Sequence, residues 1–144
     1  MKIGLLSDTH SIIDKRILKF FENCDEIWHA GDIGTIKTLE SLEKFKKIRA
    51  VYGNIDNHQI RKEVNEFLLL KYEKLVILII HIAGKPPKYN KITYNLIKKH
   101  KPNILICELV GDYFIKEGII PYINHIKSNL LSSNCNLLFL IKFL

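Results

Sequence analysis

The chain has 144 residues and a mass of 16.8 kDa, which suits one domain with a hydrophobic core of its own. Its hydrophobic content of 47% and charged content of 26% are ordinary for a globular protein. The formal net charge of +7 favours anionic partners, so phosphate esters and nucleic acids are both admissible. A solvated lysine-rich face is the simpler explanation of that charge.

Cysteine usage and the lengths of the apolar runs exclude several classes of protein. The three cysteines show no metal-type pairing, and their odd number argues against a disulfide framework, so a reduced, cytoplasmic setting is expected. No signal peptide is expected, because Asp8 and His10 interrupt the first apolar stretch. Residues 75–82 and 137–144 are too short to span a bilayer, which needs about 20 apolar residues. No membrane partner is therefore expected.

Strand-like and helix-like patterns alternate along the first three quarters of the chain. Apolar runs bounded by polar or glycine residues predict strands of a mostly parallel sheet over residues 2–7, 26–30, 48–52 and 75–80. Apolar residues at helical spacing predict helices over residues 14–21, 35–45 and 91–100. Residues 67–72 should pair antiparallel with residues 75–81, and residues 103–107 should form a further strand. The order β-α-β-α-β-loop-β-β-α-β predicts a layered α/β domain.

Five polar side chains lie at the ends of the predicted strands: Asp8, His10, Asp32, Asn54 and His81. Open α/β sheets bind their ligands at the carboxyl edge, where these residues are expected to meet. Asp8 and His10 can both face one metal ion, and a carboxylate such as Asp32 can bridge two cations about 3.5–4 Å apart. Mixed aspartate, asparagine and histidine ligation suits Mn²⁺, Fe²⁺ or Zn²⁺ better than Ca²⁺. The pattern predicts a two-metal centre.

Each of these elements alone has a plainer explanation. An aspartate or asparagine that follows glycine is more often a turn residue, and His81 alone would more often be a hydrogen-bonded core histidine. Four such elements, each at the end of a separate strand and in this order, make a metal centre the favoured interpretation.

The segments GLLSDTH (residues 4–10), HAGD (29–32) and VYGNID (51–56), followed by HIAGKP (81–86), resemble the motifs of calcineurin-like metallophosphoesterases, especially YfcE-type small phosphodiesterases. The resemblance covers about residues 1–107 and implies an α/β/β/α sandwich. It implies Asp8 and His10 at one metal ion, Asp32 as a bridge, and Asn54 and His81 at the other ion. It also implies that a small phosphodiester is hydrolysed by water that two divalent ions activate. Mn²⁺ is the favoured metal, with Fe²⁺, Zn²⁺ or Ni²⁺ as alternatives.

The chain departs from that family after Cys107. The family's last motif is Gly-His-x-His after a strand, whereas residues 108–111 read Glu-Leu-Val-Gly and no His-x-His occurs anywhere. Many relatives have a proton-donating histidine where Ile55 stands, and small phosphodiesterases often lack it. His58 is more simply a loop-surface histidine than a catalytic one. With two metal-ligand histidines missing, the expected activity is below that of a complete relative.

The C-terminal segment and the function leave alternatives open. Residues 108–144 are assigned to the same single domain, 1–144, as a divergent tail, with a frameshift as one explanation, and the apolar end at residues 137–144 has no assignable partner strand. A non-catalytic scaffold or interaction protein is the alternative to a phosphodiesterase, because a retromer coat subunit shows that this fold can serve as a scaffold. A nucleic-acid binder is supported by charge alone. A homo-oligomer stays open.

Overall fold

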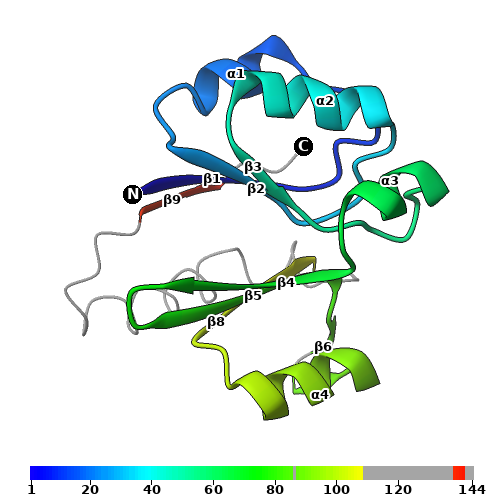
Figure 1. Cartoon of the computed structure of the whole chain (residues 1–144), viewed down its shortest axis with the longest axis vertical. Coiled ribbons are helices and arrows are strands. Elements are labelled where there is room, and N and C mark those ends of the chain that lie inside the picture. Colours follow the sequence, from blue (N-terminus) through cyan, green and yellow to red (C-terminus); the bar gives the residue numbers. More distant parts are fainter. Residues whose placement is uncertain (86, 109–137, 142–144) are drawn as a thin grey trace.

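Two β-sheets lie face to face, and helices cover the outer face of each (Figure 1). The computed structural model describes residues 1–85, 87–108 and 138–141. The strand order is β3-β2-β1-β9 in the first sheet and β4-β5-β8 in the second. All pairings in the first sheet are parallel, whereas β5 pairs antiparallel with β4 and parallel with β8. This layering confirms the α/β/β/α sandwich that the resemblance implied.

The predicted elements occur in the predicted order, and the structure adds α3, β6, β7 and β9 to them. The strands of the first sheet are β1 (Lys2–Leu6), β2 (Glu26–His29), β3 (Ile48–Ala50) and β9 (Leu138–Ile141). Those of the second sheet are β4 (Phe67–Tyr72), β5 (Leu75–Ile82) and β8 (Ile104–Glu108), and a small hairpin joins β6 (Gly84–Lys85) to β7 (Lys88–Tyr89). The helices are α1 (Lys15–Phe20), α2 (Ile36–Phe45), α3 (His58–Glu63) and α4 (Lys91–His100).

Apolar side chains fill both sides of the first sheet because successive residues of a strand point to opposite faces. In β1, Ile3 and Leu5 belong to the core shared with the second sheet, whereas Leu6 packs in the layer under α1. Ile77 and Ile79 of β5 enter the shared core from the other side and are fully buried. This packing fixes the separation of the two sheets, so the end of β5 lies close to the loops of the first sheet.

Three expectations from the sequence are wrong. Residues 75–80 were expected in one mostly parallel sheet with residues 2–7, 26–30 and 48–52, but β5 belongs to the second sheet. Residues 53–66 were expected to form a loop, but they contain α3, whose first N–H groups, on Gln59 and Ile60, donate to the Asn57 side chain. The apolar C-terminal end does have a partner, because Leu138–Ile141 pairs with β1. Parallel partners lie far apart in sequence, so no local pattern shows such a pairing.

The rest of the C-terminal segment lies outside the described residues: only Glu108 and Leu138–Ile141 of the predicted divergent tail are placed. Within the part of the chain that the structure describes, no helix is long and apolar enough to cross a bilayer.

Candidate metal centre

The loops after β1 and β2 carry Asp8, His10 and Asp32 to the carboxyl edge of the first sheet. The three residues have φ values of 58°, 43° and 57°, in the left-handed region that side chains rarely adopt. Hydrogen bonds hold this backbone: the Asp8 N–H donates to the Gly31 carbonyl (3.0 Å), and the His10 N–H donates to the Asp32 carbonyl (3.1 Å). Strained backbone of this kind concentrates at functional sites, where the surrounding structure enforces it.

Gly31 and Gly53 make room for the side chains of the cluster. Gly31 has φ 106°, and a Cβ at this position would lie 2.5 Å from Nδ1 of His81. A Cβ at Gly53 would overlap the Asp32 carboxylate. At Gly31 the positive φ also favours glycine over any residue with a side chain. For Gly53, whose φ is not positive, the requirement is the close approach of Asp32.

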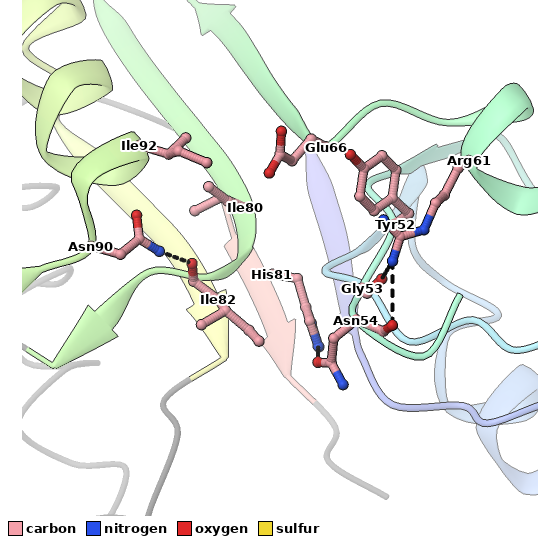
Figure 2. A pocket seen from close by; sticks show the side chains of 10 residues that line it. All are labelled: Tyr52, Gly53, Asn54, Arg61, Glu66, Ile80, His81, Ile82, Asn90 and Ile92. Carbon is pink, nitrogen blue, oxygen red and sulfur yellow. Dashed lines mark hydrogen bonds between the residues drawn. The ribbon is translucent and has the colours of Figure 1, made fainter. Parts of the chain in front are cut away.

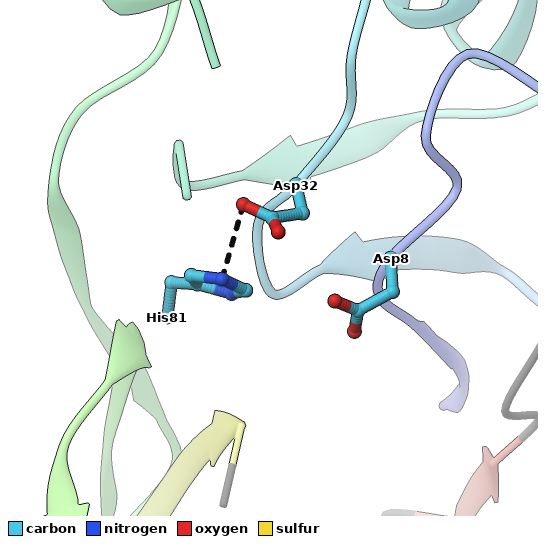
Figure 3. Close-up of side chains that lie close together, drawn as sticks. All are labelled: Asp8, Asp32 and His81. Atoms are coloured by element: carbon cyan, nitrogen blue, oxygen red, sulfur yellow. Dashed lines mark ion pairs between the residues drawn. The ribbon is translucent and has the colours of Figure 1, made fainter. Parts of the chain in front are cut away.

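The five predicted ligands form one cluster. One ligand atom from each of Asp8, Asp32 and His81 lies within 4.8 Å of the others (Figure 3). His10 Nε2 lies 3.8 Å from Asp8 Oδ1 and 3.7 Å from Asp32 Oδ2. His81 Nε2 lies 3.1 Å from both Asp32 Oδ1 and Asn54 Oδ1. The Asp32 carboxylate therefore lies between the two imidazoles.

The tautomer of His81 follows from its neighbours. Its Nδ1 lies 2.8 Å from the Ala30 carbonyl oxygen, which can only accept, so Nδ1 carries the proton. In the neutral ring, Nε2 then presents a lone pair to the Asp32 carboxylate. An imidazole fixed by a carbonyl at its other nitrogen is the usual arrangement of a metal-ligating histidine. Facing acceptors of this kind are stabilised by a cation between them, so the donor set fits a divalent metal ion.

Exposure differs across the cluster. The side chains of Asp32 and His81 are 6% and 4% exposed, whereas those of Asp8 and His10 are 27% and 53% exposed. The Ser7 hydroxyl donates to Asp8 Oδ2, and the Ile55 N–H donates to Asp32 Oδ1 (3.2 Å). Asp32 and His81 are therefore on the buried side of the cluster, whereas Asp8 and His10 face solvent.

Asp56 is a supporting residue that the sequence analysis missed. It is buried, and its carboxylate accepts from the N–H groups of Ile33 (3.1 Å), Gly34 (2.7 Å) and Gly53 (2.8 Å). It thereby joins the loop that carries Asp32 to the loop that carries Asn54. The residue stands in the segment VYGNID, but nothing in the sequence shows that its side chain turns inward.

His29 also supports these loops, through buried hydrogen bonds. The Gly31 N–H donates to Nδ1 of His29 (3.2 Å), so Nε2 carries the proton and faces the Thr9 hydroxyl (3.0 Å), which donates to the Ile33 carbonyl (3.1 Å). Burial lowers the pKa of His29 to about 3, so the ring is neutral at physiological pH. The sequence placed His29 in a strand and gave it no role.

His58 is the weaker candidate from the sequence. It is exposed as the first residue of α3, and among the described residues no hydrogen bond or ion pair joins its side chain to the five ligands.

Comparisons with known proteins agree with this architecture. A model of the calcineurin-like phosphoesterase superfamily domain matches residues 1–107. No curated protein matched the sequence. The solution structure of the Thermotoga maritima protein TM1076 is 24% identical, with a TM-score of 0.60, over 73% of this chain and 70% of that chain.

Two structures of Vps29 are also similar. Vps29 of Chaetomium thermophilum is 13% identical, with a TM-score of 0.60, over 74% of this chain and 61% of that chain. Vps29 of Entamoeba histolytica, complexed with Zn²⁺, is 18% identical, with a TM-score of 0.55, over 73% of this chain and 62% of that chain. At these identities the likeness shows the fold alone. The matched part of this chain spans only 61% and 62% of the two Vps29 chains.

Proposed function

The chain belongs to the calcineurin-like phosphoesterase superfamily, and we propose that it hydrolyses a small phosphodiester with the aid of two divalent metal ions. The observation that carries the proposal is the buried Asp32 carboxylate between the imidazoles of His10 and His81. Asp8 and His10 would hold one ion, Asn54 and His81 the other, and Asp32 would contact both. Mn²⁺ is the proposed metal, on the donor set and the family resemblance.

The chain's own residues position the ligands. Divalent ions bound here would supply positive charge that lowers the pKa of a water nucleophile and neutralises charge on the phosphoryl oxygens. The Ala30 carbonyl fixes the orientation of His81, and the Ile55 N–H fixes one oxygen of Asp32. Because these groups are held before substrate arrives, little reorganisation is needed during the reaction.

We expect this chain to be less active than a relative that has the Gly-His-x-His motif. β8 ends at Glu108, whose Cα partner on β5 is Ile82, so this strand leads to the edge that holds His81. The family's Gly-His-x-His would follow there, and this sequence has none. Loss of even a residue that supports a ligand costs about 10–100-fold in metal affinity, so loss of a direct ligand costs at least as much.

The test is Mn²⁺-dependent hydrolysis of bis(p-nitrophenyl) phosphate by protein first stripped with a chelator. Asp32→Asn keeps the size of the side chain but removes the charge that both ions would share, and should abolish turnover. The matched control is Glu40→Gln on α2, which neutralises an exposed carboxylate and should change nothing. Metal-independent turnover, or full activity in Asp32→Asn, would refute the mechanism.

A non-catalytic interaction protein on the same fold is the second candidate. It is favoured by the absence of His-x-His from the sequence and by the similarity to proteins named Vps29. Mn²⁺ binding that depends on Asp32, without turnover of any diester, would favour this candidate over the hydrolase.

A further inference from the structure

A cavity of about 260 Å³ opens beside the proposed metal ligands (Figure 2). Asn54 and His81 form part of its wall, so the cavity and the metal centre share two residues. A phosphodiester has two ester substituents, and phosphorus at the metal centre would bring one of them into this space. The residues that line the cavity therefore bear on which substituent is accepted.

The wall has an apolar side and a polar side. Figure 2 shows Ile80 and Ile92 opposite Tyr52, with Glu66 between them at the top of the view. Ile92 is 46% exposed, although it is apolar, and the fully buried residue of α4 is Thr93. An apolar surface left open beside a candidate active site suits a flat ring of a ligand.

Arg61 and Glu66, the two charged residues that line the cavity, differ in their hydrogen bonds with the protein. Arg61 donates to the carbonyls of Asp56 (2.7 Å), Gly53 (3.2 Å) and Asn54 (3.2 Å), and its guanidinium carbon lies 4.5 Å from the centre of the Tyr52 ring. The guanidinium is thus held by the protein. In contrast, the Glu66 carboxylate has no hydrogen bond or ion pair with any described residue. It is the charged group of the cavity that a ligand can engage.

An ionised carboxylate only accepts hydrogen bonds, so Glu66 suits a ligand that donates one. The same charge repels an anionic substituent and so disfavours it without any steric block. An aliphatic wall, an aromatic residue and a carboxylate acceptor together match an uncharged ring system that bears a hydroxyl group. A nucleoside has this combination, and a carboxylate that accepts from a sugar hydroxyl is a common way to hold one.

We propose that this cavity receives an uncharged, hydroxyl-bearing ester substituent of nucleoside size, and that Glu66 determines specificity by accepting a hydrogen bond from its sugar hydroxyl. The ring of the substituent packs against Ile92, the exposed apolar residue of the wall. The inference rests on the proposed phosphodiesterase function, because it assigns the substrate class of that site.

The test compares two diesters that differ in one hydroxyl group: thymidine 5′-(p-nitrophenyl phosphate) and its 3′-deoxy counterpart. With Mn²⁺ present, kcat/KM should be about tenfold higher for the hydroxylated ester, as expected for one hydrogen bond to a charged group. Glu66→Ala should remove this preference, so that kcat/KM becomes equal for the two esters. The matched control is Glu63→Ala, an exposed glutamate of α3 that does not line the cavity and should keep the preference.

A preference that survives Glu66→Ala, or that is lost equally in Glu63→Ala, overturns the assignment. A second measurement separates this result from failure of the proposed function. Saturation-transfer NMR measures the binding of thymidine alone to the metal-free protein. Absence of turnover with both esters refutes the hydrolase, whereas thymidine binding that weakens about tenfold in Glu66→Ala alone still supports the cavity. Thymidine binding that is absent, or indifferent to Glu66, refutes the cavity.

Discussion

The two sheets supply their parts of the candidate metal centre in different ways. The first sheet contributes Asp8, His10 and Asp32 from loops beyond its strand ends, with left-handed backbone. The second sheet contributes His81 from within β5, where the side chain is buried and hydrogen-bonded to Ala30. The conformation of the loops depends on buried polar groups that form hydrogen bonds with them, whereas the position of His81 depends on how the two sheets pack. Changes to the two supports should therefore have separable effects on metal binding and on stability.

The largest expected effect comes from removing the loop support. Asp56→Ala leaves the N–H groups of Ile33, Gly34 and Gly53 without their acceptor, and each such group costs about 1–3 kcal/mol. The free energy of unfolding in urea should fall by about 3–5 kcal/mol, and Mn²⁺ affinity in the folded protein should fall more than about tenfold. Asp56→Asn retains one acceptor oxygen and should lose less. Unchanged Mn²⁺ affinity in Asp56→Ala would show that the loops hold their geometry without it.

Truncating a side chain in the core that the two sheets share should lower the free energy of unfolding but leave the conformation of the loops unchanged. Ile79 is fully buried between the sheets, and Ile79→Ala should lower the free energy of unfolding by about 3 kcal/mol through lost burial and a cavity. Below its unfolding transition, the variant should bind Mn²⁺ within about threefold of the unaltered chain. Ile12, whose side chain is 70% exposed, provides the control, since Ile12→Ala should change stability by less than about 0.5 kcal/mol. A loss of Mn²⁺ affinity in Ile79→Ala as large as that in Asp56→Ala would remove the distinction between the two supports.

Lowering the pH should reduce the stability of the folded protein through His29, in the first sheet. The unfolded chain protonates this histidine below its ordinary pKa of 6.5, whereas burial keeps the folded chain from doing so until about pH 3. The unfolded state therefore binds more protons in this window, and stability falls as the pH drops through it. Between pH 7 and pH 5 this group should account for about 2 kcal/mol of lost stability.

Replacing the histidine makes that contribution measurable. In His29→Gln the fall in the free energy of unfolding between pH 7 and pH 5 should shrink by about 2 kcal/mol. His58→Gln changes an exposed histidine of α3 and should keep the full pH dependence. Equal pH dependence in His29→Gln and the unaltered chain would contradict the assignment.

Local sequence patterns predicted most helices and strands, but not the buried polar residues that hold the loops of the candidate site. The predicted helix over residues 91–100 coincides with α4, and the one predicted over residues 35–45 matches α2 to within one residue. α3 was missed because Ile60 is the one apolar residue in its sequence HQIRKE, so no apolar period emerges, and its start depends on the Asn57 cap. Asp56 and His29 were missed for another reason, since their partners are backbone groups of loops that are distant in sequence or irregular in shape.

The sequence by itself determined the superfamily, the order of the elements and the residues that gather as candidate ligands. Parallel strands end at a common edge, so the polar residues that follow β1, β2 and β3 must approach one another. His81 lies in the second sheet, and its approach to them depends on how the two sheets pack. Only the tertiary structure decided which polar groups turn inward, that Leu138–Ile141 pairs with β1, and that Glu66 lines a cavity beside His81. These features join segments that lie far apart in the sequence, so no local period within one strand or helix connects them.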